Sequence, residues 1–373
     1  MFATAAYVGA RLASDLEFAT LPVGLHLGGT LAAVIPASLL MKRIGRRKGF
    51  AMGSLLGIAG SLLAAYAIMI EHFGWYCAGA GCMGLFNGFG TYYRFAAAEA
   101  APSSSPDTAI SYVLAGGVIA ALLGPNLARW TMNITTQPFA GCYLALAAVY
   151  AGSLVAILFV QFPSVDADRQ QRRTRTFLQF VRQPQFPVAI LAGVIGYAVM
   201  NLIMTSTPLM MHEHRHSFDA AASVIQWHML GMFAPSFLTP RLIGRIGLVA
   251  TLQGGAVLCA LCVALNLLST DFRVLVLALT LLGVGWNFLA VSAASLLVQI
   301  CTPEERAKTQ AINDFLMLAA ITTTALCAAG LLQEFGWNRL NLGAGVVLAI
   351  IPAAVMWLQA VRTKTEEIEI STS

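Results

Sequence analysis

Polar side chains interrupt the long apolar stretches of this sequence, and their types suit binding rather than catalysis. Asn87, Thr91 and Arg94 follow one another at i, i+4 and i+7, so a helix would place all three on one face. Because a charged residue within an apolar stretch is costly and usually functional, Arg94 is a candidate ligand for an anionic group. The alternative is that Arg94 extends to polar solvent or pairs with Glu99 or Asp314.

Further polar and aromatic residues recur in the same stretches. Asn87 and Asn287 stand in similar motifs, and buried amides need hydrogen-bond partners. A lining of amides and aromatic rings suits an amphipathic or aromatic organic molecule better than a bare ion. Taken singly, each residue has the alternative role of packing or hydrogen bonding between helices. The other candidate binding residues are Tyr92, Tyr93, Asn201, Gln226, Trp227, His228 and Trp286.

Two titratable side chains, His228 and Glu99, are candidate proton carriers, since histidine titrates near neutral pH. The histidines of "MHEHRH" (211–216) could bind a transition metal, but a solvated loop is the favoured interpretation because no matching ligands lie in the apolar stretches. We therefore expect no metal and no cofactor. The sequence also has no evident nucleophile–base pair and no phosphate-binding Gly-Lys-Ser/Thr loop, so we expect neither an enzyme nor an ATP-driven pump.

Composition indicates the environment of these residues. The chain has 373 residues, of which 58% are hydrophobic and 10% charged, whereas soluble domains carry about 25% charged residues. This composition predicts a polytopic membrane protein, and nucleic acid is not an expected partner because the basic residues occupy short gaps between apolar stretches. Eleven stretches reach the roughly 20 residues that span a bilayer: 21–41, 49–70, 74–98, 108–130, 138–161, 187–209, 219–239, 248–268, 272–300, 309–331 and 336–361.

The first residues, "MFATAAYVGA", are largely apolar but reach only about half the length of a span. We expect them to be part of a twelfth, incomplete helix. A short re-entrant or surface segment is the alternative.

Basic residues predict the orientation of the chain. Sixteen Lys and Arg residues lie in alternate gaps on one side, and five lie on the other. Because basic residues favour the cytoplasmic side, the cluster "MKRIGRRKG" (41–49), the polar stretch 162–186 and both termini are predicted to be cytoplasmic.

An internal repeat divides the chain. "PASLLMKRIG" (36–45) matches "PSFLTPRLIG" (235–244), "GLFN" (84–87) matches "VGWN" (284–287), and "TAISYVLAG" (108–116) matches "QAINDFLML" (310–318). Both copies begin on the same predicted side, so the repeat is parallel. The predicted parts are an N-terminal six-helix half (1–161), a linker (162–186), a C-terminal six-helix half (187–361) and a cytoplasmic tail (362–373).

This organisation, with Gly45-Arg46-Arg47 after the second helix, resembles the major facilitator superfamily of secondary transporters. Two positions depart from the family motif, since Ser38 replaces a Gly and Lys42 replaces an Asp. Stretches such as "VIQWHMLGMFAPSF" and "GVGWNFLAVSAASLL" resemble a bacterial branch of unassigned substrate. The resemblance implies an all-α fold of twelve membrane helices, with a cavity between the halves that opens alternately to each side.

The residue at position 42 changes what the family motif implies. In the family, the Asp at this position faces the start of the eleventh helix and helps to close the cytoplasmic side. We expect a reversed latch here, in which Lys42 or Arg43 faces Asp314, while Arg241 faces Asp107 in the repeat. The alternative is that these are solvated loop charges, because exposed pairs contribute only ~0–1 kcal/mol. Gly45, Arg46 and Arg47 complete the predicted gating residues.

The sequence therefore predicts a monomeric secondary transporter of the bacterial cytoplasmic (inner) membrane that moves a small organic solute by alternating access, with proton coupling as a hypothesis. Its expected partners are the solute and the lipid bilayer. The alternative is a membrane protein that keeps this fold without transporting, as a sensor or a truncated copy, and the incomplete first helix favours it.

Overall fold

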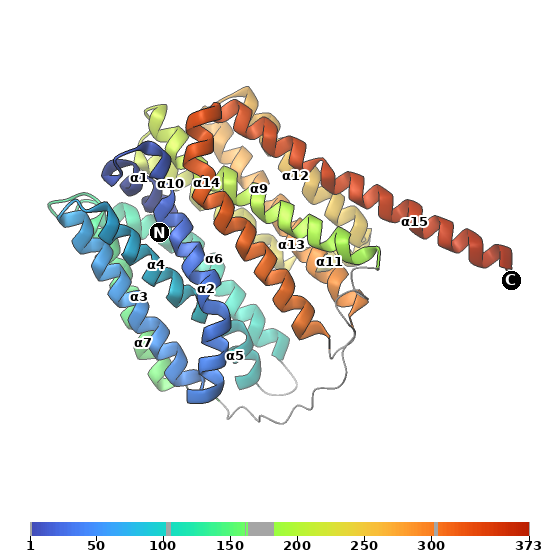
Figure 1. Cartoon of the computed structure of the whole chain (residues 1–373), viewed down its shortest axis with the longest axis horizontal. Helices are drawn as coiled ribbons and strands as arrows, with labels where there is room; N and C mark the ends of the chain where they lie inside the picture. Colours follow the sequence, from blue (N-terminus) through green and yellow to red (C-terminus); the bar gives the residue numbers. More distant parts are fainter. Residues whose placement is uncertain (1, 102–105, 161, 163–182, 302–304, 373) are drawn as a thin grey trace. The chain divides into compact units, whose positions relative to one another are not determined.

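The computed structural model is helical in its described residues, which are 2–101, 106–160, 162, 183–301 and 305–372, and none of these residues forms a strand (Figure 1). The N-terminal helices are α1 (Phe2–Leu12), η1 (Leu16–Phe18), α2 (Leu21–Ile44), α3 (Arg46–Met69), α4 (Phe73–Gly90), α5 (Tyr93–Ala100), α6 (Pro106–Thr131) and α7 (Ala140–Phe159). The C-terminal helices are α9 (Gln185–Glu213), α10 (Phe218–Phe233), η2 (Ala234–Phe237), α11 (Thr239–Ile246), α12 (Leu248–Leu268), α13 (Phe272–Ile300), α14 (Arg306–Leu348) and α15 (Ile350–Thr372).

The first compact unit contains α1 to α7 together with the later segments Met204–Gln226 and Ile321–Gly336. Within it, α4 packs against α2 and α3, and α3 also packs against α7. The helices approach closely where glycines leave space. A Cβ atom on Gly84 would lie 2.0 Å from the carbonyl oxygen of His26, so only glycine fits this crossing.

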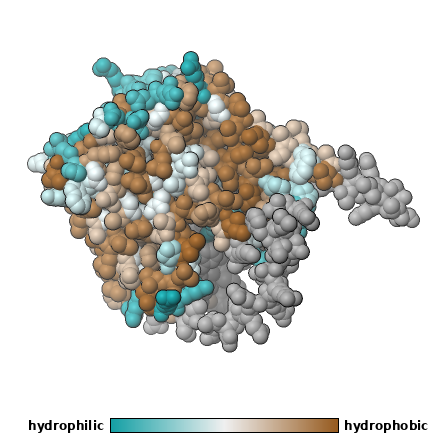
Figure 2. All heavy atoms as spheres, viewed as in Figure 1, coloured by the Kyte–Doolittle hydropathy of each residue, from teal (hydrophilic) through white to brown (hydrophobic). Residues whose placement is uncertain are grey.

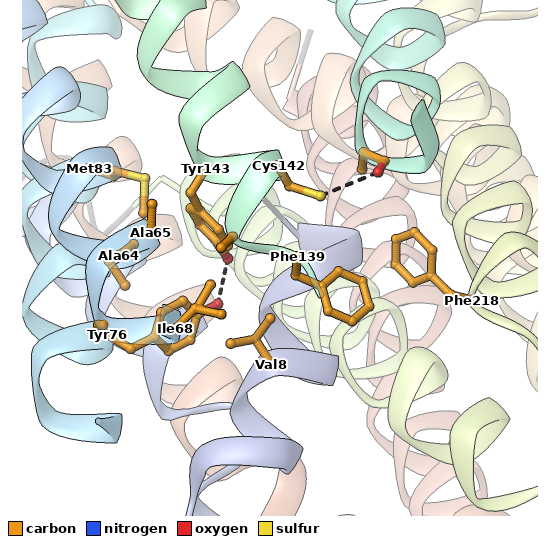
Figure 3. Packing of buried hydrophobic residues seen from close by; sticks show 14 of the residues in the cluster. Val8, Ala64, Ala65, Ile68, Tyr76, Met83, Phe139, Cys142, Tyr143 and Phe218 are labelled. Carbon is orange, nitrogen blue, oxygen red and sulfur yellow. Dashed lines mark hydrogen bonds between the residues drawn. The ribbon is translucent and has the colours of Figure 1, made fainter. Parts of the chain in front are cut away.

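A buried aromatic cluster attaches α1 to the rest of the first unit (Figure 3). The rings of Tyr76 on α4 and Tyr143 on α7 meet edge to face at 5.6 Å, and their hydroxyls are hydrogen bonded. Thr4 Oγ1 on α1 lies 3.4 Å from the Tyr143 hydroxyl oxygen. Because buried hydroxyls need partners, this chain of hydroxyls fixes how the three helices meet.

The second compact unit contains the part of α9 up to Ile203, the stretch Trp227–Ala320 and the chain from Trp337 onward. Here α13 packs against α12 and also contacts η2 and α11. A Cβ atom on Gly283 of α13 would lie 2.3 Å from the carbonyl oxygen of His228 on α10. The α10–α13 crossing thus repeats the contact between α2 and α4.

The turns between α2 and α3 and between α11 and α12 also correspond. Gly45 has φ 86° and ψ 158°, and Gly247 has φ 88° and ψ 159°, a conformation that side chains disfavour. The sequence match paired Gly45 with Gly244, which lies inside α11. That pairing is wrong by three residues, although the repeat itself is visible in the shared turn.

Several predicted spans differ from the observed helices, and the one expected over 219–239 is α10 followed by η2. The single helix expected over 74–98 is instead α4 and α5, separated by Thr91 and Tyr92, because glycine is a poor helix former near the end of α4. The predicted gap between spans 309–331 and 336–361 agrees with the kink at Gly336, where φ is 73°, but α15 continues to Thr372 through residues expected to form a tail.

The compact units do not coincide with the two sequence halves, because parts of α9, α10 and α14 belong to the first unit. The division into six-helix halves therefore stays a prediction. Most of the predicted linker, residues 163–182, lies outside the described residues.

Candidate substrate-binding site

The N-terminal candidate residues lie at the junction of α4 and α5 in the first unit. Asn87 Nδ2 donates a hydrogen bond to Thr30 Oγ1 on α2 at 3.3 Å. Thr91 Oγ1 donates to the carbonyl oxygen of Gly88 at 2.8 Å, three residues earlier in the chain. The hydroxyl of Tyr92 donates to the carbonyl oxygen of Val34 at 2.8 Å. The bonds of Asn87 and Tyr92 join neighbouring helices, which was the alternative interpretation, whereas that of Thr91 is local, and the binding role of all three stays a prediction.

The neighbouring residues Tyr93 and Arg94 are partly buried by packing. The ring of Tyr93 lies 4.6 Å from that of Phe50, and the Tyr93 hydroxyl is buried without a hydrogen-bond partner. Arg94 is half-buried and takes part in interactions. The side chain of Glu99 lies outside the described residues, so its role as a proton carrier stays a prediction.

Asn287 connects four elements of the second unit. Its Nδ2 donates to the carbonyl oxygen of Met232 at 2.8 Å and to Ser236 Oγ at 2.7 Å. Its Oδ1 accepts a hydrogen bond from Thr239 Oγ1 at 2.6 Å. The amide is 2% exposed, so these bonds tie α13 to α10, η2 and α11.

An aromatic pair lies one residue before Asn287. The rings of Trp286 on α13 and Tyr197 on α9 meet edge to face, with their centroids 4.9 Å apart. Trp286 is 9% exposed and its Nε1 has no hydrogen-bond partner. Since a buried donor without a partner costs about 1–3 kcal/mol, this indole can gain a hydrogen bond from a bound solute.

His228 is fully buried on α10. Its Nδ1 lies 2.8 Å from the carbonyl oxygen of Leu279, so this nitrogen carries the proton of the neutral ring. Its Nε2 is then an acceptor, and it has no partner. Asn201 on α9 is also buried, whereas Trp227 is half exposed and Gln226 accepts a hydrogen bond from Arg129 of α6.

His26 is a residue that the sequence analysis missed. It is buried on α2, and its carbonyl oxygen meets Gly84 as that of His228 meets Gly283. The separation of the two histidines in the sequence, 202 positions, equals the offset of the third repeat match, which could have identified it.

Three of the predicted gating residues, Arg47, Asp314 and Arg241, each make a hydrogen bond to a group other than a predicted latch partner. Arg47 donates through Nη2 to the carbonyl oxygen of Leu158, at the end of α7, where a positive charge stabilises a helix. Asp314 accepts a hydrogen bond from Gln310 Nε2 at 2.6 Å, one turn earlier on α14. Arg241 Nη1 donates to the carbonyl oxygen of Phe237 at 3.4 Å.

The reversed latch itself stays a prediction. Lys42 and Arg43 are exposed at the end of α2, and the side chain of Asp107 lies outside the described residues. The loop histidines have local contacts, since His214 Nδ1 lies 2.9 Å from the carbonyl oxygen of Met210. Among the described residues, no group of three His, Cys, Asp or Glu side chains could hold a metal ion.

Helix length and surface character define the class of the protein. Seven helical segments of the described chain are long and apolar enough to cross a membrane. Large apolar side chains are exposed along them, and Figure 2 shows hydrophobic residues over most of the visible described surface. An exposed apolar surface of this extent is typical of a protein whose helices contact membrane lipid. The protein is an integral membrane protein built of helices.

Comparison with known proteins gives the family. The sequence pattern of the Major Facilitator Superfamily matches residues 1–265 and 189–372. The riboflavin transporter RfnT of Brucella anthropi (strain ATCC 49188) is 36% identical over 347 residues, which are 92% of this chain and 87% of that protein. The uncharacterized MFS-type transporter YddS of Bacillus subtilis (strain 168) is 27% identical, covering 96% of this chain and 87% of its own. The chain belongs to the major facilitator superfamily.

Solved structures have the same fold. A point mutant of the nucleoside transporter NupG has a TM-score of 0.73 at 14% identity, with 96% of this chain and 95% of that chain covered. The transporter FucP, in its outward conformation, has a TM-score of 0.60 at 14% identity, with 96% of each chain covered. The resemblance predicted from Gly45-Arg46-Arg47 and the internal repeat is confirmed.

Proposed function

We propose that this protein is a secondary transporter that moves riboflavin or a closely related flavin across the bacterial cytoplasmic membrane by alternating access. The observation that carries the solute assignment is the 36% identity with riboflavin transporter RfnT over most of both chains. We also propose that the transporter is a monomer. Both of its termini lie in the cytoplasm in this proposal, because the distribution of basic residues favours that orientation.

The Tyr197–Trp286 pair supports a flat aromatic solute. An isoalloxazine ring offers π faces for stacking, and aromatic contacts contribute about 0.5–1.5 kcal/mol beyond the burial of area. The ring also carries carbonyl acceptors and an N–H donor. Trp286 Nε1 is a buried donor and His228 Nε2 a buried acceptor, and neither has a partner in the structure. The second unit therefore contains groups of the kinds that a flavin edge would satisfy.

Riboflavin uptake tests the proposal. In cells that depend on external riboflavin, expression of the protein should raise the uptake of radiolabelled riboflavin. Trp286→Ala should reduce that uptake about tenfold, the factor that corresponds to a loss of about 1.4 kcal/mol. Trp286→Phe, which keeps a ring but removes the N–H, should give an intermediate value.

The control is Trp357→Ala, because Trp357 is 50% exposed on α15. It should leave uptake unchanged when protein levels in the membrane are equal. Uptake no higher than in empty cells, with folded protein in the membrane, would reject the proposal. Riboflavin binding without uptake would instead favour the non-transporting sensor.

A further inference from the structure

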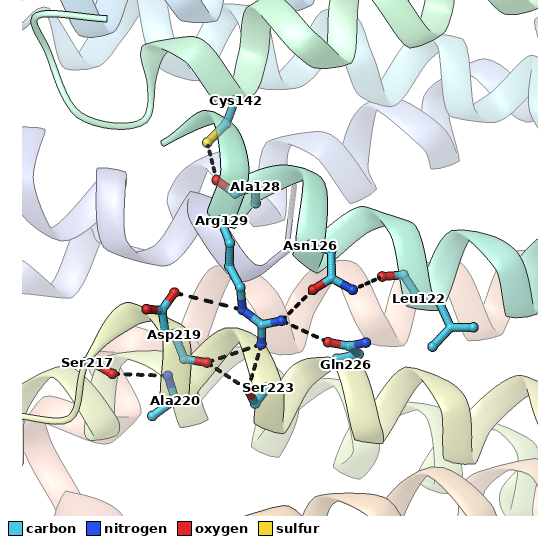
Figure 4. A network of polar contacts seen from close by, with 10 residues as sticks. All are labelled: Leu122, Asn126, Ala128, Arg129, Cys142, Ser217, Asp219, Ala220, Ser223 and Gln226. Carbon is cyan, nitrogen blue, oxygen red and sulfur yellow. Dashed lines mark hydrogen bonds and ion pairs between the residues drawn. The ribbon is translucent and has the colours of Figure 1, made fainter. Parts of the chain in front are cut away.

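Arg129, near the end of α6, connects the two sequence halves through hydrogen bonds (Figure 4). Its Nη1 donates to Gln226 Oε1 on α10 at 3.1 Å and to Asn126 Oδ1 on its own helix at 2.7 Å. Its Nη2 donates to Ser223 Oγ at 2.6 Å and to the carbonyl oxygen of Asp219 at 3.2 Å. One guanidinium thus holds three acceptors on α10.

These acceptors form an ordered site. Asp219, Ser223 and Gln226 follow one another at i, i+4 and i+7, so they lie on one face of α10. Ser223 Oγ also donates to the Asp219 carbonyl oxygen at 2.8 Å. On α6, Asn126 is held in place because its Nδ2 donates to the carbonyl oxygen of Leu122 at 2.8 Å.

The neutral acceptors contribute more than the ion pair. Arg129 Nε lies 3.9 Å from Asp219 Oδ1, and the Asp219 side chain is 73% exposed, whereas that of Arg129 is 20% exposed. Exposed ion pairs contribute little because water and salt screen them. The hydrogen bonds of the charged guanidinium to partly buried acceptors are the stronger interaction.

An apolar contact between the halves lies at the same end of α10. The ring of Phe218, next to Asp219 in the chain, meets Phe139 edge to face at 5.0 Å (Figure 3). It also meets Tyr7 edge to face at 5.4 Å. Tyr7 also packs edge to face on His212 at 5.1 Å. The start of α10 is therefore held to the N-terminal half by aromatic packing and by Arg129.

A second segment of the C-terminal half makes a similar contact. The backbone N–H of Ala329 on α14 donates to Thr20 Oγ1 at 3.2 Å, and both residues are buried. A Cβ atom on Gly24 would lie 2.3 Å from Leu326 Cδ2, so α2 and α14 are closely packed here. Two segments of one half are thus closed onto the other within a single compact unit.

We propose that Arg129 locks a closed gate between the halves, at the membrane face where α6 ends and α10 begins. The basic residues predict that this face is extracytoplasmic. In alternating access, a contact between the halves at one face exists in only one of the two states, so the bonds of Arg129 must break when this face opens. The inference rests on the alternating access of the proposed function and not on the identity of the solute.

The test measures how often the contact between α6 and α10 opens to water, in the absence of riboflavin. Ala222 of α10 is 0% exposed and packs in the same aromatic cluster, so Ala222→Cys reports opening. The labelling rate of this cysteine by a maleimide is measured in purified protein in lipid nanodiscs, with Cys82→Ser and Cys327→Ser to lower the background. Arg129→Ala should raise the rate about tenfold, a shift of about 1.4 kcal/mol in the equilibrium of the gate.

Two controls separate the lock from other effects of charge. Arg273→Ala removes an exposed arginine at the start of α13, on the same predicted face, and should leave the rate unchanged. Asp219→Asn keeps the carbonyl acceptor while removing the carboxylate, so it should label like the parent. A tenfold rise in Asp219→Asn would overturn the assignment of the lock to the hydrogen bonds.

An unchanged rate in Arg129→Ala, repeated with Ala221→Cys as a second buried reporter on α10, would overturn the proposal. Because no riboflavin is present, this result is independent of the solute assignment. If the protein takes up riboflavin but Arg129→Ala does not change the labelling rate, only the proposed lock is rejected. If Arg129→Ala raises the labelling rate but the protein takes up no riboflavin, only the proposed solute is rejected.

Discussion

Two buried amides, Asn266 and Asn341, hold together helices of the second unit. Asn266 Nδ2 on α12 donates to Asn341 Oδ1 on α14 at 2.8 Å, and Asn341 Nδ2 donates to the carbonyl oxygen of Trp337 at 2.9 Å. Trp337 Nε1 donates to the carbonyl oxygen of Asn266 at 3.1 Å, which closes the network. Each member supports the others, so the loss of one leaves a buried group without its partner.

Asn341→Ala should therefore destabilise the protein by about 1–2 kcal/mol, because the Asn266 amide loses its acceptor. The measurement is the Tm of the purified protein in one detergent, which should fall. Asn338→Ala, at an exposed position one residue after Trp337, is the matched control and should leave the Tm close to that of the parent. Equal Tm values for both variants would show that the network is not stabilising.

The sequence indicated which polar residues matter, but it did not predict their hydrogen-bond partners. The motif match placed Asn87 and Asn287 in corresponding positions, and both bond to the neighbouring helix of their own half. The acceptors could not be predicted, because they depend on how two helices cross. Arg129 contributed only to the count of basic residues, since its partners on α10 are about ninety positions away in the sequence.

At the scale of the elements, the turn glycines give a direct test of the repeat. Gly247→Ala should lower the free energy of unfolding by about 1–3 kcal/mol, because alanine is strained at φ 88° and ψ 159°. Gly244→Ala is the matched control, since Gly244 lies inside α11 with open space around it. It should leave stability unchanged or raise it by about 0.5–1 kcal/mol. A larger loss of Tm in Gly244→Ala than in Gly247→Ala would contradict the structural pairing of Gly45 with Gly247.

Most long helices could be predicted from the length of their apolar stretches, because a bilayer sets that length. Their interruptions were harder to predict. The break at Thr91–Tyr92 lies where local backbone preferences and packing decide, and hydropathy does not report it, whereas the predicted gap between 331 and 336 does lie beside the turn at Gly336. The three-residue error at Gly244 has the same origin, because both glycines follow an isoleucine in a similar local sequence.

At the scale of the whole molecule, composition predicted a polytopic membrane protein, and the resemblance of the parallel repeat and Gly45-Arg46-Arg47 to the major facilitator superfamily predicted the family, which the family match confirms. The grouping of Met204–Gln226 and Ile321–Gly336 with the N-terminal helices was not predictable. It depends on contacts such as Phe139–Phe218 and Thr20–Ala329, which join distant parts of the chain. The solute was predicted only as an amphipathic or aromatic organic molecule, and riboflavin is a proposal from the relative RfnT.

Riboflavin counterflow in liposomes tests the central claim most directly. The purified protein is reconstituted into vesicles loaded with unlabelled riboflavin, and the entry of external radiolabelled riboflavin is followed over time. A secondary transporter of flavin should produce a transient accumulation above equilibrium that protein-free vesicles lack and that Trp286→Ala diminishes. Entry equal to that of protein-free vesicles, with correctly folded protein in the bilayer, would contradict the assignment of this chain as a riboflavin transporter.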